Sequence, residues 1–175
     1  MKLKKSLLLV LVNLAILASC KNQNQVEVET SEKEEILDVK SEKLAVEKIM
    51  KAYKDAIQNL TTDGTFELFT EDATVFEQGK VEGTYKDYID GHLGPELGHF
   101  KSFTFSDYEI KTTVNLPYAY TTENYLYTIV LKGDKNNGNS ERTIESKGLA
   151  TSILEKIDGN WKIVHSHTSF KKLNQ

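Results

Sequence analysis

The last stretch of the chain constrains its fold more than any other. It reads GNWKIVHSHTSF, a turn followed by alternating large and polar side chains. Because side chains alternate across a strand, one face of this strand is expected to hold Trp161, Ile163, His165, His167 and Ser169. That face changes from apolar to polar, which is typical of a strand that starts in a core and ends at the wall of a wet pocket. A slip of one residue would reverse both faces, so we expect a fixed register.

The first 19 residues are typical of a signal peptide. Three lysines precede an apolar run over residues 7–17, which is too short and wrongly flanked for an ordinary membrane-spanning helix. The sequence Leu-Ala-Ser-Cys at residues 17–20 resembles the bacterial lipobox, in which the signal is cut before a cysteine that carries lipid. We therefore expect a lipoprotein of the bacterial cell envelope, anchored to a membrane through Cys20. The alternative is a plain secretory signal with an incidental cysteine.

The mature chain excludes several kinds of chemistry. Cys20 is the only cysteine, so no intrachain disulfide, Cys-rich zinc site or catalytic thiol is expected in the folded domain. Removing residues 1–19 takes away three of the 22 basic residues and none of the 26 acidic ones, which leaves a net charge of −7. Nucleic acid needs a basic footprint and is not an expected partner. Residues 20–38 are charged and poor in large apolar groups, which predicts a flexible tether.

Three helices are expected in the first half of the folded domain. Over residues 41–60, apolar side chains recur at spacings of three and four, which predicts an amphipathic helix. A short second helix is expected over residues 66–69. A third should begin after Thr84, which can form a capping box with Asp87, and should stop at Gly94-Pro95.

Strands dominate the second half. After Phe100 the period changes to two, which predicts four long strands joined by hairpins, and a phase slip near Ser106-Asp107 predicts a bulge in the first. A shorter strand pair is expected from residue 74. Helices followed by strands over residues 39–175 indicate one α+β domain, in which a strongly curved antiparallel sheet carries the helices over its concave face.

This order of elements, together with the closing sequence DGNWKIVHSHTS, resembles the NTF2-like superfamily in its SnoaL-like or DUF4440-type branch. The resemblance covers about residues 40–170. It implies a cone with an internal pocket, a frequent homodimer, and relatives that include ketosteroid isomerases, polyketide cyclases, dehydratases and binding domains. The isomerases' aspartate and tyrosine constellation is not evident here, so no catalytic residue is carried over, and the fold does not settle the activity.

Four side chains form a candidate metal site. His165 and His167 lie about 6 to 7 Å apart along a strand, so their rings could meet at one ion. His92, on the apolar face of its helix, and Glu77, within an apolar strand, are the candidate third and fourth ligands. Such a set suits zinc, copper or iron. The alternative is that both strand histidines are wall groups bonded to neighbouring hydroxyls and carbonyls.

Metal-free acid–base catalysis is a third interpretation of the same residues. A histidine among His165, His167 and His92 would move a proton while a tyrosine such as Tyr53 stabilises an oxyanion. The expected pocket wall also includes Glu77, Tyr85, Tyr88, His99, Tyr125, Tyr127 and Trp161. Core packing is the preferred interpretation of Trp161 and of most of the tyrosines.

The sequence therefore leaves three hypotheses. The first is a membrane-tethered lipoprotein whose pocket binds a small molecule without turnover. The second is an isomerase, dehydratase or cyclase that needs no cofactor, and the third is a zinc or copper site. The expected partners are the small molecule, the membrane through the lipid on Cys20, and a second copy of the chain.

Overall fold

The computed structural model describes residues 23–173 except 134–137 and 139, and for residues 23–37 it describes the backbone alone. The predicted signal peptide and Cys20 lie outside the described residues. The chain divides into two compact units, Met1–Asp38 and Val39–Gln175. Within the described residues, no helix combines the length and the apolar character that spanning a bilayer requires.

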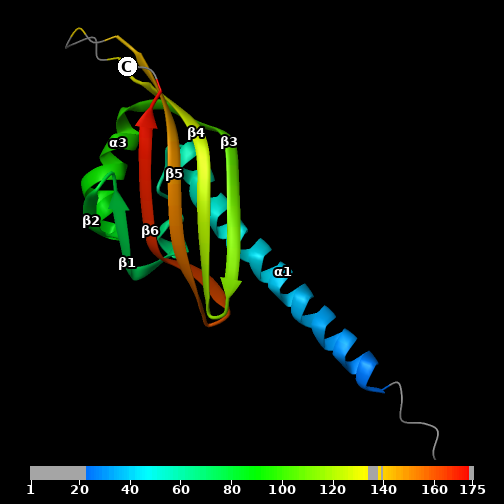
Figure 1. Cartoon of the computed structure of the whole chain (residues 1–175). Helices are drawn as coiled ribbons and strands as arrows, with labels where there is room; N and C mark the ends of the chain where they lie inside the picture. Colours follow the sequence, from blue (N-terminus) through cyan, green and yellow to red (C-terminus); the bar gives the residue numbers. More distant parts are fainter. Residues whose placement is uncertain (1–22, 134–137, 139, 174–175) are drawn as a thin grey trace, which may run out of the picture. The chain divides into compact units, whose positions relative to one another are not determined.

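Helix α1 extends over Gln23–Gln58 (Figure 1). The amphipathic helix expected over residues 41–60 is thus present, and the backbone of residues 23–38, where a flexible tether was expected, belongs to the same helix. The tether was inferred from its lack of apolar groups, which decides burial rather than helix formation. Glutamate, lysine and glutamine, which are abundant there, are good helix formers without any burial.

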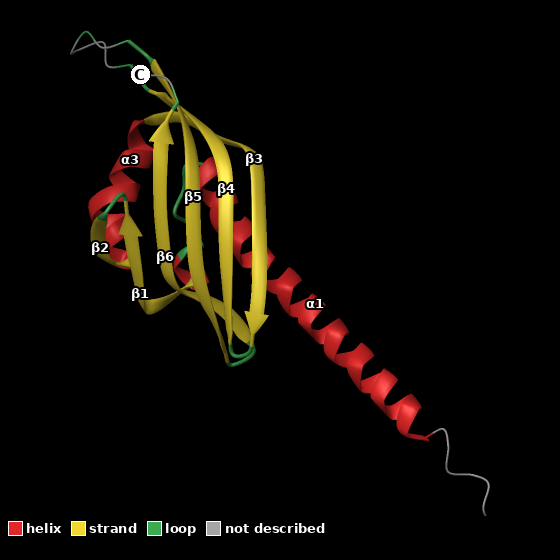
Figure 2. Cartoon of the chain, viewed as in Figure 1, coloured by secondary structure: helices red, strands yellow, loops and turns green. Residues whose placement is uncertain are grey.

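Six strands form one curved, open sheet in the order β2-β1-β6-β5-β4-β3 (Figures 1 and 2). Their bounds are β1 Phe69–Glu77, β2 Lys80–Thr84, β3 Phe100–Asn115, β4 Tyr118–Leu131, β5 Arg142–Ile157 and β6 Asn160–Lys172. The predicted α+β architecture and the four long antiparallel strands are confirmed. One pairing is parallel: β1 lies beside β6, the last strand of the chain, and the two strands run in the same direction.

The short helices differ from the prediction. Residues Phe66–Leu68 form only a single 3₁₀ turn, η1, and Phe69 already begins β1. The capping box of Thr84 and Asp87 is present and starts α2, Tyr85–Tyr88. Gly94-Pro95 does not stop the chain's helical course, because η2, Ile89–Leu93, leads directly into α3, Gly94–His99. Proline lacks only an N–H, which the first turn of a helix does not need.

Two of the irregularities in the sheet register bear on the predicted faces of β3 and β6. The one predicted near Ser106-Asp107 is present, since the register of β3 against β4 shifts there. A second lies in β6, where Ile163 pairs with Leu154 and His165 pairs with Ile153, so that Val164 has no partner. The expectation of one continuous face in β6 was therefore wrong: Trp161 and Ile163 face the core, but Ser166 continues that face.

A buried polar contact joins α1 to the sheet. Glu42 accepts a hydrogen bond from Trp161 Nε1 at 2.7 Å and another from the ammonium of Lys156. Along the same helix, Val46, Met50 and Ile57 pack into the core with Phe69, Leu154 and Ile163. The hydrogen bond from Lys156 lowers the pKa of Glu42 in spite of the opposing effect of burial.

Replacing Glu42 by alanine should destabilise the domain. Trp161 Nε1 and Lys156 would lose a charged acceptor, which we expect to lower the free energy of unfolding by about 2 kcal/mol. The emission of Trp161, the only tryptophan, reports the transition in urea. Lys48→Ala, at an exposed position of the same helix, is the control. Because the folded pKa is depressed, the contribution of Glu42 should be complete above the pKa of an unfolded glutamate and disappear as the pH falls through the folded pKa. Equal stability of the two variants would contradict this role.

Candidate functional site

The domain contains a pocket of about 640 Å³ between the sheet and the helices. Most of its wall is aromatic or aliphatic and comes from β3, β4, β5 and β6, with Tyr53 and Ile57 from α1. The aromatic members on the strands are Phe100, Phe103, Phe105, Tyr125, Tyr127 and Phe170. Basic side chains line it too, at Lys80, Arg142 and Lys172. A pocket of this size and character suits a small, largely apolar molecule.

One wall of the pocket carries a polar cluster of Glu77, Tyr88 and His92. The Tyr88 hydroxyl donates a hydrogen bond to Glu77 Oε2 at 2.8 Å, and His92 Nδ1 lies 3.9 Å from the same oxygen. The side chain of Glu77 is only 17% exposed. Burial raises the pKa of Glu77, while the bond from Tyr88 and the charge of His92 oppose the rise. Burial also keeps the pKa of Tyr88 far above its ordinary value, so this hydroxyl stays protonated.

His92 is surrounded by carboxylates. Its Nδ1 atom lies 3.1 Å from Glu82 Oε1, and its Nε2 atom lies 3.4 Å from Glu96 Oε1. His92 Nδ1 and Glu82 Oε1 are both buried without an aligned hydrogen-bond partner in the described part of the chain. The polar wall therefore combines a carboxylate, a hydroxyl and an imidazole, which are groups that can exchange protons and form hydrogen bonds.

The structure places several of the sequence-predicted pocket residues against the pocket and others elsewhere. Those that line it are Tyr53, Glu77, Tyr88, His92, Tyr125 and Tyr127. Tyr85 instead stacks on Phe69 in the core, with ring centroids 3.6 Å apart. Trp161 is buried against Glu42. His99 ends α3 and is exposed, outside the pocket wall.

His165 and His167 lie on the outer face of the sheet, opposite the pocket. His165 Nδ1 is 2.7 Å from Thr74 Oγ1, and Phe76 packs edge-on against both rings. The bulge at Val164 is the cause, because it moves Ser166 and Thr168 inward in place of the histidines. His165 and His167, which were expected in the pocket wall, are therefore not among the residues that line the pocket.

The four predicted metal ligands are not brought together. Glu77 and His92 line the pocket, whereas His165 and His167 do not. Within the described residues, no group of three or more histidine, cysteine, aspartate or glutamate side chains is arranged to hold a metal ion. Zinc or copper binding remains a prediction.

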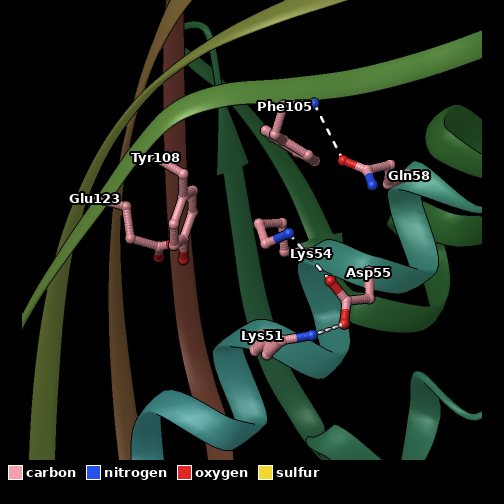
Figure 3. A network of polar contacts seen from close by, with 7 residues as sticks. All are labelled: Lys51, Lys54, Asp55, Gln58, Phe105, Tyr108 and Glu123. Atoms are coloured by element: carbon pink, nitrogen blue, oxygen red, sulfur yellow. Dashed lines mark hydrogen bonds and ion pairs between the residues drawn. The ribbon is translucent and has the colours of Figure 1, made fainter.

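A second polar site, adjacent to the pocket, was not predicted from the sequence. A smaller space of about 50 Å³, here named the inner cavity, shares Tyr53, Ile57, Phe105, Tyr125 and Thr168 with the pocket wall. It also contains the carboxylate of Glu123, which accepts a hydrogen bond from the Tyr108 hydroxyl at 2.5 Å (Figure 3). Glu123 was not predicted because a charged residue after Thr121 and Thr122 does not suggest burial, although its position in β4, two residues from Tyr125, puts it on the inward face.

Comparison with protein families assigns the domain. The model of the SnoaL-like domain matches residues 46–171. The chain belongs to the SnoaL-like domain family. This SnoaL-like domain thus includes nearly all of the unit Val39–Gln175, with the pocket, the inner cavity and all six strands. No curated protein matches the chain.

Solved structures resemble this SnoaL-like domain throughout its length. A candidate ketosteroid isomerase from Shewanella frigidimarina is 25% identical, with a TM-score of 0.59 over 70% of this chain and 92% of the other. An NTF2-like superfamily protein from Salmonella enterica is 20% identical, with a TM-score of 0.60 over 76% and 92% of the two chains. A candidate dehydratase of the NTF2-like family from Streptomyces avermitilis is 12% identical, with a TM-score of 0.63 over 75% and 97%. The last two likenesses establish the NTF2-like fold alone.

Proposed function

We propose that the pocket binds a small molecule with an apolar body and at least one polar group directed at Glu77, Tyr88 and His92. The observation that carries this proposal is the pairing of a mostly aromatic wall with one buried polar cluster. Apolar surface supplies most of the binding free energy in such pockets, and a few polar groups set the orientation. The family contains both binding domains and enzymes, so binding is the common element of the first two sequence-based hypotheses.

Filling the pocket should abolish binding of an apolar probe. Ile144 on β5 lines the pocket, so Ile144→Trp should weaken the binding of Nile red at least tenfold, measured by fluorescence titration. Ile153 on the same strand faces outward and is 40% exposed, which makes Ile153→Trp the matched control. If both variants bind the dye as the natural protein does, the dye lies elsewhere and the pocket loses its assigned role. Urea unfolding of each variant verifies that the fold is intact.

Proton transfer by Glu77 is a second candidate function, which the polar cluster favours specifically. A carboxylate buried beside a protonated tyrosine can remove a proton from carbon next to a carbonyl group, while a neighbouring donor stabilises the enolate oxygen. Glu77 would return the same proton to another carbon, so the reaction is an isomerisation without a cofactor. The likeness to a candidate ketosteroid isomerase at 25% identity agrees with this chemistry.

The proton-transfer candidate predicts isomerisation of 3-cyclohexenone to 2-cyclohexenone, followed by ultraviolet absorbance. Glu77→Gln should lower the rate at least 100-fold, because an amide cannot accept the proton. Glu71→Gln, at an exposed position on the same strand, should leave it unchanged. The base must be ionised, so the rate should rise with pH through a pKa above that of an exposed glutamate. An unaltered rate in Glu77→Gln, or no rate above buffer in the natural protein, would refute catalysis of this reaction by Glu77.

We also propose that the chain is a lipoprotein anchored through Cys20 to a membrane of the bacterial cell envelope. The support is the apolar run over residues 7–17 followed by Leu-Ala-Ser-Cys. Mass spectrometry of the protein from a bacterial membrane fraction should find a chain that begins at Cys20 and carries acyl groups. Cys20→Ser should abolish this modification, whereas Ser19→Ala should keep it. A full-length chain without lipid in the membrane fraction would contradict the proposal.

A further inference from the structure

Aromatic rings surround the inner cavity. Tyr53, Phe105, Tyr108 and Tyr125 all line it. The centroids of Phe105 and Tyr125 are 5.1 Å apart at an interplanar angle of 83°, and those of Tyr108 and Tyr125 are 6.1 Å apart. A backbone hydrogen bond from Phe105 to the Gln58 side chain, 3.2 Å long, fixes the strand to α1 at this point (Figure 3). Aromatic rings grouped around one small space favour a cation, because the face of each ring carries negative electrostatic potential.

The same cavity contains the buried carboxylate of Glu123. Glu123 is 8% exposed and is hydrogen-bonded by the hydroxyls of Tyr108 and Thr121, at 2.5 and 3.5 Å. No lysine, arginine or histidine of the described residues forms an ion pair with it. A buried carboxylate without a counter-charge is costly, and burial accordingly raises the pKa of Glu123. Ser152 Oγ, which also lines the cavity, is 1% exposed and lacks a hydrogen-bond partner among the described residues.

Lys54 already shows how these rings interact with a cation. Its ammonium nitrogen lies 5.6 Å from the ring centroid of Phe105 and 5.5 Å from that of Tyr108. Asp55 holds this nitrogen at 3.0 Å and also binds Lys51 (Figure 3). Lys54 therefore occupies the faces of two rings without forming an ion pair with Glu123.

We infer that the inner cavity receives the ammonium group of a ligand whose apolar body lies in the pocket. This inference rests on the proposed binding function and names the class of ligand, an amphiphilic amine. The rings and Glu123 would together replace the water around the ammonium, and Ser152 would accept a hydrogen bond from it. The shared residues Tyr53, Phe105 and Tyr125 make the two spaces adjacent, so one molecule can extend into both.

Two probes of the same length test whether the protein prefers a ligand with a positive charge. Calorimetric titration of the purified protein with hexylammonium and with 1-hexanol compares a cation with a neutral molecule that has the same apolar chain. We expect hexylammonium to bind about tenfold more tightly. Glu123→Gln should remove most of this preference and leave the affinity for hexanol unchanged. Glu109→Gln, at an exposed position on β3 where the carboxylate bonds Asn124, is the matched control.

Lys54→Met gives a test that a damaged fold cannot imitate. Removing the resident ammonium frees the faces of Phe105 and Tyr108 and removes a repelling charge, so hexylammonium should bind several-fold more tightly than it does to the natural protein. Hexanol affinity should stay the same. A gain in affinity confined to the cation is not expected from any general loss of stability.

The possible outcomes separate this inference from the function on which it rests. Equal binding of both probes, or a preference unchanged by Glu123→Gln, would overturn the inference while binding of hexanol or Nile red still supports the pocket. A preference lost in Glu77→Gln and kept in Glu123→Gln would place the ammonium at the other carboxylate and also overturn it. Failure of both probes and of Nile red to bind would overturn the inference together with the proposed function.

Discussion

The bulge at Val164 is the constraint on which the site depends. Because Val164 has no partner in β5, the side chains after it change faces, and Ser166 and Thr168 complete the inner wall while His165 points outward. Without this extra residue, two imidazoles would lie inside a space that is now bounded by small hydroxyl groups. The room for the inner cavity therefore comes from a local irregularity of the backbone, on the strand whose other end is fixed by Trp161 and Glu42.

The sequence predicted the features that repeat and those interruptions that change the phase of the apolar residues, but not the bulge in β6. The three-and-four spacing around Val46 and Met50 predicted the helix that packs on the sheet, and the short-range capping pattern of Thr84 and Asp87 predicted the start of α2. The bulge near Asp107 was visible because the apolar residues change phase there. At Val164 the apolar residues do not change phase, so the sequence gives no sign of a bulge. Only the pairing with β5 shows that Val164 is the residue without a partner.

The residues of the site were also only partly predictable from the sequence. Glu77 stood out because a charge interrupts an apolar strand, and tyrosines such as Tyr125 and Tyr127 followed from strand alternation. Glu123 follows the same alternation, but its burial depends on Tyr108 across the sheet and on α1 above it, contacts between residues far apart in the chain. Likewise, the expected neighbours of His92 were Glu77, His165 and His167. Glu77 is a neighbour, but Glu82 and Glu96 stand where the two histidines were expected. Local pattern identifies a buried face but not the partners across it.

The two buried carboxylates have different surroundings, and this difference bears on what each can do. Glu77 lies beside Tyr88 and His92, groups that can donate or exchange protons, and it is open to the larger pocket. Glu123 has hydroxyl groups and aromatic rings around it, and the ammonium group of Lys54 lies over two of those rings. Proton transfer therefore suits Glu77, whereas recognition of a fixed positive charge suits Glu123. A ligand that used both would place its reactive carbon and its ammonium at opposite sides of the shared tyrosine wall.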